Sequence, residues 1–463
     1  MQRKYNFHLF FAFLLAVPFI VSCAHYPVNL PLENYSPDTG YRLKNMGVPD
    51  NSGDVLLILS FSGGGTRAAA FSYGVLEELA RTEVSINGRN RRMIDEVDIV
   101  SAVSGGSFTA AYYGLFGDRI FEDFESRFLK RNVQGDLIVR EFFFFPNWFR
   151  LASPWYSNND LAAEYYDKYL FEGGTFGDIA SREGPAVIIN ATDMTEGITF
   201  SFEQEMFDII CSDLSGFPVA RATAASSAVP VFFSPITLRN YAGKCGYEPG
   251  WISDALQEKD SSPRRYYQAI HAMPYLDISR KHYVHLVDGG ISDNLGLRVV
   301  IEKCIKLGNA WDSLKYAGLG NTHKFVFIVV NAETGADVRS DMNESTPGPV
   351  SVLNSVTNIV LSRFNIETLE LLKLNFRQWT EDIRKGRCND PAFKDHMDSC
   401  GDIEFYLMEV DFDALPDESE RRYLKGLPTS FALPAESVDA LRGAARKILR
   451  TSEEFQRLLK DLD

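Results

Sequence analysis

Apolar and polar positions follow one another along the chain in blocks whose lengths predict strands and helices. Short apolar runs with the length of buried strands occur at residues 55–61, 97–103, 187–193, 283–287 and 324–330. Residues 68–79 place Val75, Leu76 and Leu79 on one side, which is typical of an amphipathic helix. Strands that take turns with helical stretches predict one elaborated α/β domain.

A glycine-rich segment follows three of these apolar runs. The segments are Gly63–Arg67, Ser104–Gly106 and Asp288–Gly290. Together they offer backbone N–H groups, a serine on a sharp turn and a carboxylate at the end of a strand, where open α/β sheets keep their sites. A serine hydroxyl needs a neighbouring base and a stabilised oxyanion to act as a nucleophile. The combination predicts acyl-transfer chemistry, whereas each segment alone is also a common structural turn.

The serine turn has the small flanking residues that a nucleophile elbow requires. In such an elbow a strand turns abruptly into a helix, so the residues two before and two after the serine must be small. Ala102 and Gly106 occupy these positions around Ser104. Residues 107–115 are a plausible following helix, whose N-terminus favours developing negative charge.

The glycines at residues 63–65 allow the backbone to approach a substrate oxygen closely. A nucleotide phosphate loop is the competing interpretation of this segment. Such a loop needs Gly-Lys-Ser/Thr after its glycines, whereas Thr66 and Arg67 stand here. We expect a structural role for Arg67, either bracing the loop or pairing with a carboxylate.

The three segments resemble the motifs of the patatin-like phospholipases, which are bacterial and plant lipid acyl hydrolases. The family pattern is a G-G-G-x-R loop, a G-x-S-x-G elbow and a D-G-[GA] motif. The matching residues here are Gly63–Arg67, Ala102–Gly106 and Asp288–Gly290. The resemblance covers residues 54–330 well and is weaker beyond them. Ala102 departs from the pattern by replacing the first glycine of the elbow, and we expect a slightly strained turn that still forms.

The resemblance implies a three-layer α/β/α fold with a central, mostly parallel sheet and C-terminal helical additions. It implies a catalytic dyad in which Ser104 is the nucleophile and Asp288 takes its proton. The implied oxyanion donors are the N–H groups of Gly63, Gly64, Gly65 and Gly105. The residues in supporting positions are Arg67, Gly106 and Gly289. Neither a cofactor nor a metal is expected.

A Ser–His–Asp triad is the alternative to the dyad. The chain has 7 histidines, and His285 lies shortly before Asp288 in the same apolar run. At its spacing from Asp288, strand alternation places the two side chains on opposite faces. His323 precedes a strand and His396 lies in a polar stretch. We therefore favour the dyad.

The first residues have the features of an export signal. Two basic residues precede a continuous apolar stretch at residues 9–21, which is short beside the about 20 residues of a membrane span. Ile20–Cys23 resembles a bacterial lipobox with a cysteine that becomes lipidated. We expect a lipoprotein signal peptide at residues 1–22 and a lipid anchor at Cys23, with the protein in the bacterial cell envelope at the outer membrane. An ordinary cleaved signal or an uncleaved anchor is the alternative.

The remaining organisation follows from composition. Residues 23–53, interrupted by prolines and glycines, predict a tether. Residues 54–463 form the predicted hydrolase domain, with its core motifs in 54–330 and a C-terminal extension in 331–463, where a final amphipathic helical tail should dock. An aromatic cluster at residues 142–156 is interpreted either as packed core or as a surface for acyl chains or a membrane interface.

The formal net charge of −15 excludes nucleic acid as a partner, because binding to phosphate backbones needs a basic face.

Of the 6 cysteines, Cys211 with Cys245 and Cys388 with Cys400 are candidate disulfides in an oxidising envelope, and fully reduced thiols are the alternative. Cys304 is then left in an apolar helix. No histidine and cysteine cluster has metal-ligand spacing.

These features predict a serine lipid acyl hydrolase of the phospholipase A, lysophospholipase or esterase type, with a lipid or phospholipid substrate and membrane attachment through Cys23. A thioesterase or transacylase would use the same residues. The alternative from another class is a non-catalytic lipid-binding or assembly lipoprotein that retains the fold. The sequence leaves the oligomeric state open.

Overall fold

The computed structural model describes residues 24–46, 51–335, 344, 346, 348–392 and 400–462. Its strands are β1 (Val55–Phe61), β2 (Glu83–Ile86), β3 (Arg89–Arg92), β4 (Val97–Val103), β5 (Ala186–Asp193), β6 (Thr199–Phe202), β7 (Ile236–Arg239), β8 (Tyr283–Val287), β9 (Lys324–Asn331) and β10 (Glu404–Asp411).

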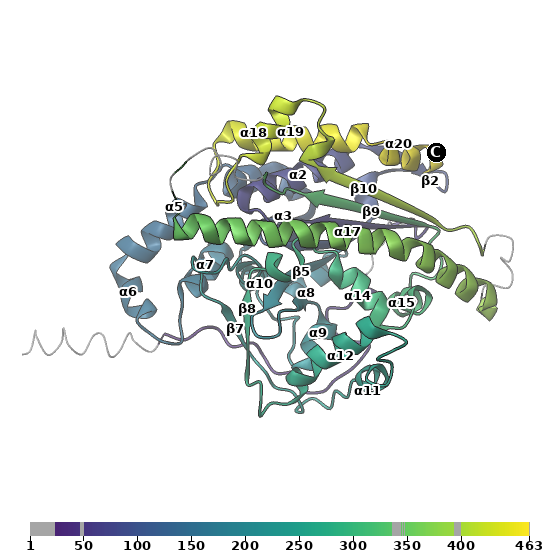
Figure 1. Ribbon diagram of the computed structural model, residues 1–463, viewed down its shortest axis with the longest axis horizontal. Coiled ribbons are helices and arrows are strands. Elements are labelled where there is room, and N and C mark those ends of the chain that lie inside the picture. The colour runs from purple at the N-terminus through teal and green to yellow at the C-terminus, as the bar shows by residue number, and fades with distance from the viewer. Residues whose placement is uncertain are drawn as a thin grey trace, which may run out of the picture.

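The helices lie between and after these strands along the chain (Figure 1). In the first half of the chain they are α2 (Gly65–Arg81), α3 (Gly105–Phe116), α4 (Ile120–Phe124), α5 (Val133–Ile138), α6 (Phe145–Leu151), α7 (Asn158–Tyr166), α8 (Phe176–Ser181), α9 (Gln204–Ile209) and α10 (Val219–Ser226). In the second half they are α11 (Gly250–Ala255), α12 (Pro263–Leu276), α13 (Gly290–Asp293), α14 (Arg298–Lys306), α15 (Ala310–Ala317), α17 (Pro349–Asn389), α18 (Glu418–Lys425), α19 (Ala435–Thr451) and α20 (Glu453–Leu462).

The central sheet has the strand order β10-β9-β1-β4-β5-β8-β7, with β6 also paired to β5. The pairs from β10 through β5 are parallel, whereas β6 and β8 run antiparallel to β5 and β7 runs antiparallel to β8. The predicted mostly parallel sheet is therefore confirmed. β8 pairs with β5 only at Thr192 and Asp193, the last residues of β5. Most of β8 therefore lies beyond the carboxyl ends of the parallel strands.

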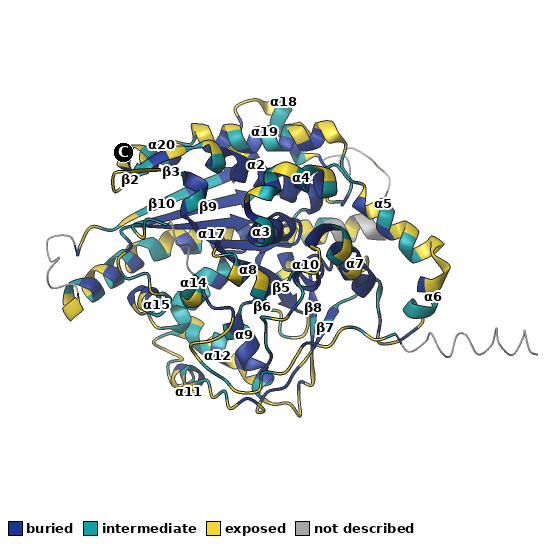
Figure 2. Cartoon of the chain, turned by 180° about the vertical axis from the view of Figure 1, so that it is seen from behind, coloured by how far each residue is buried: buried dark blue, intermediate teal, exposed yellow. Residues whose placement is uncertain are grey.

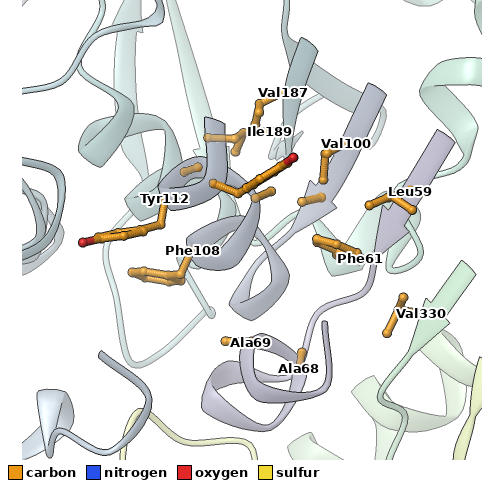
Figure 3. Packing of buried hydrophobic residues seen from close by; sticks show 14 of the residues in the cluster. Leu59, Phe61, Ala68, Ala69, Val100, Phe108, Tyr112, Val187, Ile189 and Val330 are labelled. Atoms are coloured by element: carbon orange, nitrogen blue, oxygen red, sulfur yellow. The ribbon is translucent and has the colours of Figure 1, made fainter. Parts of the chain in front are cut away.

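Strand alternation divides the core between the two faces of this sheet. On β1, Leu57, Leu59 and Phe61 belong to the larger apolar cluster with α2, α3 and α19. Leu56 and Ile58 face the other way and pack with α14, α15 and α17. Figure 3 shows the larger cluster, where side chains of β1, β4, β5 and β9 meet those of α2 and α3. The result is the predicted three-layer α/β/α arrangement.

The described part of the predicted tether, residues 24–46, packs against the domain instead of extending from it. The Tyr41 side chain is buried and its hydroxyl donates to the Val187 carbonyl at 3.0 Å. Arg42 forms a buried ion pair with Asp208 at 2.6 Å. Prolines and glycines did predict irregular backbone here, but these two side chains attach that backbone to the core. Cys23 and the predicted signal peptide lie outside the described residues.

The C-terminal extension completes the sheet. β10 pairs in parallel with β9 along its whole length, and α19 packs against α2. The helical tail predicted near the C-terminus docks as expected, in two pieces that break at Ser452. Among the described helices, none combines the length and apolar character that crossing a membrane requires.

Both predicted disulfides are present. Cys211 is bonded to Cys245, and Cys388 to Cys400. Cys304 is a free thiol, and burial raises its pKa to about 11. A thiol in this environment is protonated and unreactive at neutral pH.

Candidate active site

Ser104 lies in the turn between β4 and α3. Its backbone has φ 47° and ψ −120°, a conformation that a non-glycine residue adopts only when its surroundings enforce it. The carbonyl of Ser62 enforces it from one side by accepting the N–H of Gly106 at 3.2 Å. The strain therefore falls on Ser104 itself, while Ala102 is an ordinary buried strand residue of β4.

The structure brings Ser104 and Asp288 together, although 184 positions separate them. The Ser104 hydroxyl donates to Asp288 Oδ2 at 2.8 Å, and the Gly290 N–H donates to Asp288 Oδ1 at 2.8 Å. The two residues are only 5% and 8% exposed. Burial raises the pKa of Asp288 to about 6, and the two hydrogen bonds limit the rise because they favour the ionised form.

Backbone contacts hold Asp288 at the end of β8. Its N–H donates to the Ala228 carbonyl at 3.0 Å, and its carbonyl accepts the Thr192 hydroxyl at 2.8 Å. Gly289 packs directly against β5, since a Cβ at this position would lie 2.1 Å from the Asn190 carbonyl oxygen. Only glycine lets the chain turn here while the carboxylate stays aimed at the serine.

The glycine loop lies beside the serine. A Cβ added at Gly63 would lie 3.3 Å from Ser104 Cβ, and one added at Gly105 would lie 2.1 Å from the Gly65 carbonyl oxygen. Gly64 and Gly65 have φ of 139° and 60°, which glycine tolerates without strain. The loop after β1 and the turn after β4 therefore interlock at positions where no side chain fits.

Two backbone donors near the serine are already engaged. The Gly63 N–H donates to the Asn294 carbonyl at 3.1 Å, so the prediction that it serves as an oxyanion donor is wrong for this conformation. The Ser104 N–H donates to Ser226 Oγ at 2.8 Å. Among the described residues, no partner is found for the N–H groups of Gly64, Gly65 and Gly105. These three groups are the free donors next to the serine.

Arg67 braces the loop, as expected from the sequence. Its guanidinium is buried and donates to the carbonyls of Ala332 and Leu427 and to the Thr429 hydroxyl. Burial lowers its pKa to about 10, so it remains charged at neutral pH. The Ser430 carbonyl also accepts the Thr66 N–H at 2.9 Å. The C-terminal extension thus holds the glycine loop in place through these hydrogen bonds.

Sequence reasoning missed the polar residues that support the site. Ser226 donates to the Asn190 carbonyl at 2.6 Å while it accepts from Ser104. Asn294 contacts Asn365 of α17 at 3.4 Å, and Asn365 donates to Glu333 at 2.7 Å. The signal for Ser226 was its place in a helix of small residues; nothing local in the sequence pointed to Asn294 or Asn365.

The described histidines lie elsewhere. His285 Nδ1 is 3.1 Å from the Thr237 hydroxyl, and His323 Nδ1 is 2.7 Å from Asp54. In the part of the chain that the structure describes, no histidine is hydrogen-bonded to Ser104 or Asp288, and no group of side chains has the composition of a metal site. A cavity of about 440 Å³ between β6, α9, α12 and α14 is lined by neither Ser104 nor Asp288, so it is separate from this pair.

The mostly parallel sheet thus carries a serine elbow, a glycine loop and a buried carboxylate at its carboxyl edge. The chain matches the family model described as patatin-like phospholipase over residues 59–301. It therefore belongs to the patatin-like phospholipase family, a family of lipid hydrolases. Comparison with curated proteins gives no match.

Two similar solved structures are of human GIVD cytosolic phospholipase A2. One has 12% sequence identity and a TM-score of 0.45, and covers 89% of this chain. The other, in complex with methyl gamma-linolenyl fluorophosphonate, has 11% identity and a TM-score of 0.40, with the same coverage of this chain. This chain spans 62% and 59% of the lengths of those two chains.

Proposed function

We propose that the protein is a serine lipid acyl hydrolase in which Ser104 is the nucleophile and Asp288 is the general base. The observation that carries this proposal is the 2.8 Å hydrogen bond from Ser104 Oγ to a buried carboxylate oxygen. It is supported by the free N–H groups of Gly64, Gly65 and Gly105 beside the serine, which suit an oxyanion.

The proposed reaction has two halves. Asp288 takes the proton of Ser104 as Oγ bonds to the carbonyl carbon of the ester, and the glycine N–H groups stabilise the resulting oxyanion. The carbon–oxygen bond to the alcohol then breaks, the alcohol leaves with the proton from Asp288, and an acyl-enzyme remains. Water attacks the acyl carbon while Asp288 takes its proton, and the carboxylic acid departs as Ser104 regains a proton.

The substrate class proposed is a carboxylic ester of a lipid, hydrolysed with phospholipase A, lysophospholipase or general esterase specificity. The family supports a lipid substrate, and the net charge of −15 disfavours nucleic acid. We propose in addition that Cys23 carries a lipid that anchors the protein in the bacterial cell envelope, at the outer membrane. Several acyl chains on one cysteine would give stable attachment.

The activity should fall on the acid side of about pH 6. Because burial raises the pKa of Asp288 to about 6, the carboxylate form that accepts the serine proton is lost as the pH falls through that value. The measurement is kcat/KM for a soluble ester between pH 4 and 9. Added methanol should move this limb to higher pH, since ionisation of a carboxyl creates charge. A limb that methanol leaves in place would indicate an imidazole base instead.

The proposal is tested most directly with an alkyl fluorophosphonate, which reacts with activated serines. We expect covalent labelling of Ser104, located by mass spectrometry of the digested protein, at a rate that follows the same pH limb. Labelling should disappear after thermal unfolding, because the Ser104–Asp288 contact is lost. A folded protein that never labels would favour the alternative function, a non-catalytic lipid-binding lipoprotein with this fold.

A further inference from the structure

Two segments that are distant in the sequence expose large apolar side chains. The aromatic face, as defined here, consists of Phe142–Phe145, Trp148, Trp155, Val231 and Phe232. Phe143 is 78% exposed and Val231 is 77% exposed. Figure 2 shows α6 and the helical turn before it with many residues in the colours of exposed and intermediate positions. The interpretation of residues 142–156 as packed core is therefore wrong for most of the large apolar side chains, although Tyr156 is buried, and a cluster of exposed apolar side chains of this size marks a site of interaction.

Specific contacts fix the aromatic face in place. The Trp148 indole N–H donates to the Phe142 carbonyl at 3.1 Å, and the rings of Phe145 and Phe149 are in edge contact at 5.0 Å. Asn158, at the start of α7 shortly after Trp155, holds the second segment, because its side-chain amide donates to the Phe232 carbonyl at 2.9 Å and accepts the Ser234 N–H at 3.0 Å. The exposed rings are thus held on an ordered scaffold.

A short stretch of backbone connects the active site to the aromatic face. Ser226 accepts the Ser104 N–H, and the Ala228 carbonyl accepts the Asp288 N–H. From these two anchors the chain runs directly outward to Val231 and Phe232. Val231 has φ 77°, a conformation that is strained for a β-branched residue and that presents its side chain to solvent. The loop that leaves the Ser104–Asp288 pair therefore ends on the aromatic face.

The described chain also begins at the aromatic face. The Ala24 carbonyl accepts a hydrogen bond from the Ser153 hydroxyl at 2.5 Å, and the Tyr26 N–H donates to the Trp155 carbonyl at 2.8 Å. The rings of His25 and Trp155 are stacked, with their centroids 6.3 Å apart. Ala24 directly follows Cys23, the proposed site of lipidation. A lipid chain attached there would enter the membrane beside the exposed aromatic rings.

We propose that the aromatic face docks on a phospholipid bilayer, with its rings in the headgroup boundary, and so presents Ser104 to bilayer lipid. This inference rests on the proposed function and adds that the substrate is taken from the membrane surface. Tryptophan is enriched at membrane–water interfaces, and tryptophan and phenylalanine form the buried face of proteins that lie in the headgroup boundary. We assign this surface to a bilayer and not to a second copy of the chain for two reasons. The residue that follows the proposed lipid anchor contacts the aromatic face, and the segment that runs from the active site ends on it. The net charge of −15 opposes anionic surfaces, so binding must be driven by apolar contact and should not weaken as salt is added, because salt screens the repulsion.

The test uses residues 24–463 with Ser104→Ala, which carry no lipid and hydrolyse nothing. The probe is vesicles of phosphatidylethanolamine and phosphatidylglycerol, and binding is measured by flotation and by the blue shift of tryptophan fluorescence. We expect binding that persists at high salt and a partition coefficient about tenfold lower after Phe143→Ser with Phe145→Ser. The matched control is Leu374→Ser on α17, which is 72% exposed and outside the aromatic face, and it should bind normally.

The outcomes separate docking from catalysis. With Ser104 intact, the double phenylalanine variant should hydrolyse a short soluble ester at the original rate and lose activity on vesicles. Equal vesicle binding by the double variant and its parent would overturn the proposal. So would a parent that does not bind, or a lipid-free dimer that the double variant converts to monomer. If the proposed hydrolase function is wrong and the docking proposal is right, the protein will bind vesicles but will not hydrolyse the ester.

Discussion

Ser104→Ala should abolish ester hydrolysis while the protein remains folded. The expected loss in kcat is about 10⁴-fold or more, because removal of a serine nucleophile eliminates the acyl-enzyme route entirely. The substitution deletes one hydroxyl whose only described contact is Asp288, so the elbow keeps its backbone contacts to Ser62 and Ser226. The measurement is initial-rate hydrolysis of short nitrophenyl esters and of phospholipid, with circular dichroism to compare the folds.

Ser72→Ala is the matched control for this experiment. Ser72 is a fully buried serine of α2, and its hydroxyl has no hydrogen-bond partner among the described residues. Its removal deletes the same atom from a similar environment without touching the Ser104–Asp288 pair. We expect activity near that of the original protein. Hydrolysis that survives Ser104→Ala would exclude the proposed nucleophile, whatever the control does.

Local motifs predicted the geometry of the reacting pair because each motif fixes its own backbone. The small residues around Ser104 permit the elbow, and Gly289 permits the turn that aims Asp288. These constraints act within a few positions and are therefore visible in the sequence. The mostly parallel sheet follows in the same way from buried strands that alternate with helices.

The support of the site was beyond local reasoning because it comes from distant segments. Arg67 donates to the Leu427 carbonyl, which lies 360 positions further along the chain. The Gly63 N–H donates to the backbone carbonyl of Asn294. Any residue has such a carbonyl, so this contact depends on where α13 packs and not on which amino acid stands at position 294. The predicted tether failed for a related reason: Tyr41 and Arg42 lie in irregular backbone and find their partners only in the folded domain.

Asp288→Asn should lower kcat/KM by about 10²- to 10⁴-fold, the range associated with loss of a general base. An asparagine carbonyl still accepts the Gly290 N–H, but its amide group cannot take a proton from Ser104. The fold should be retained and even gain stability at alkaline pH. Burial raises the pKa of Asp288 to about 6, above its value in the unfolded chain. The native state therefore loses stability as the pH rises toward about 6, because the carboxyl ionises more readily in the unfolded chain. The neutral amide of asparagine removes this loss of stability.

Asp293→Asn is the control that separates the role of a base from the removal of a buried charge. The pKa of Asp293 is likewise raised to about 6 by burial, but its carboxylate accepts the Arg298 N–H at 2.6 Å and makes no described contact with Ser104. An asparagine carbonyl can accept the same N–H, so activity should be largely preserved. Thermal melts at pH 5 and pH 8, compared with kcat/KM at both, distinguish the two variants. If Asp288→Asn stays active while His285→Ala does not, the base is a histidine and the dyad is wrong; if only Asp288→Asn fails, the proton of Ser104 passes to this carboxylate.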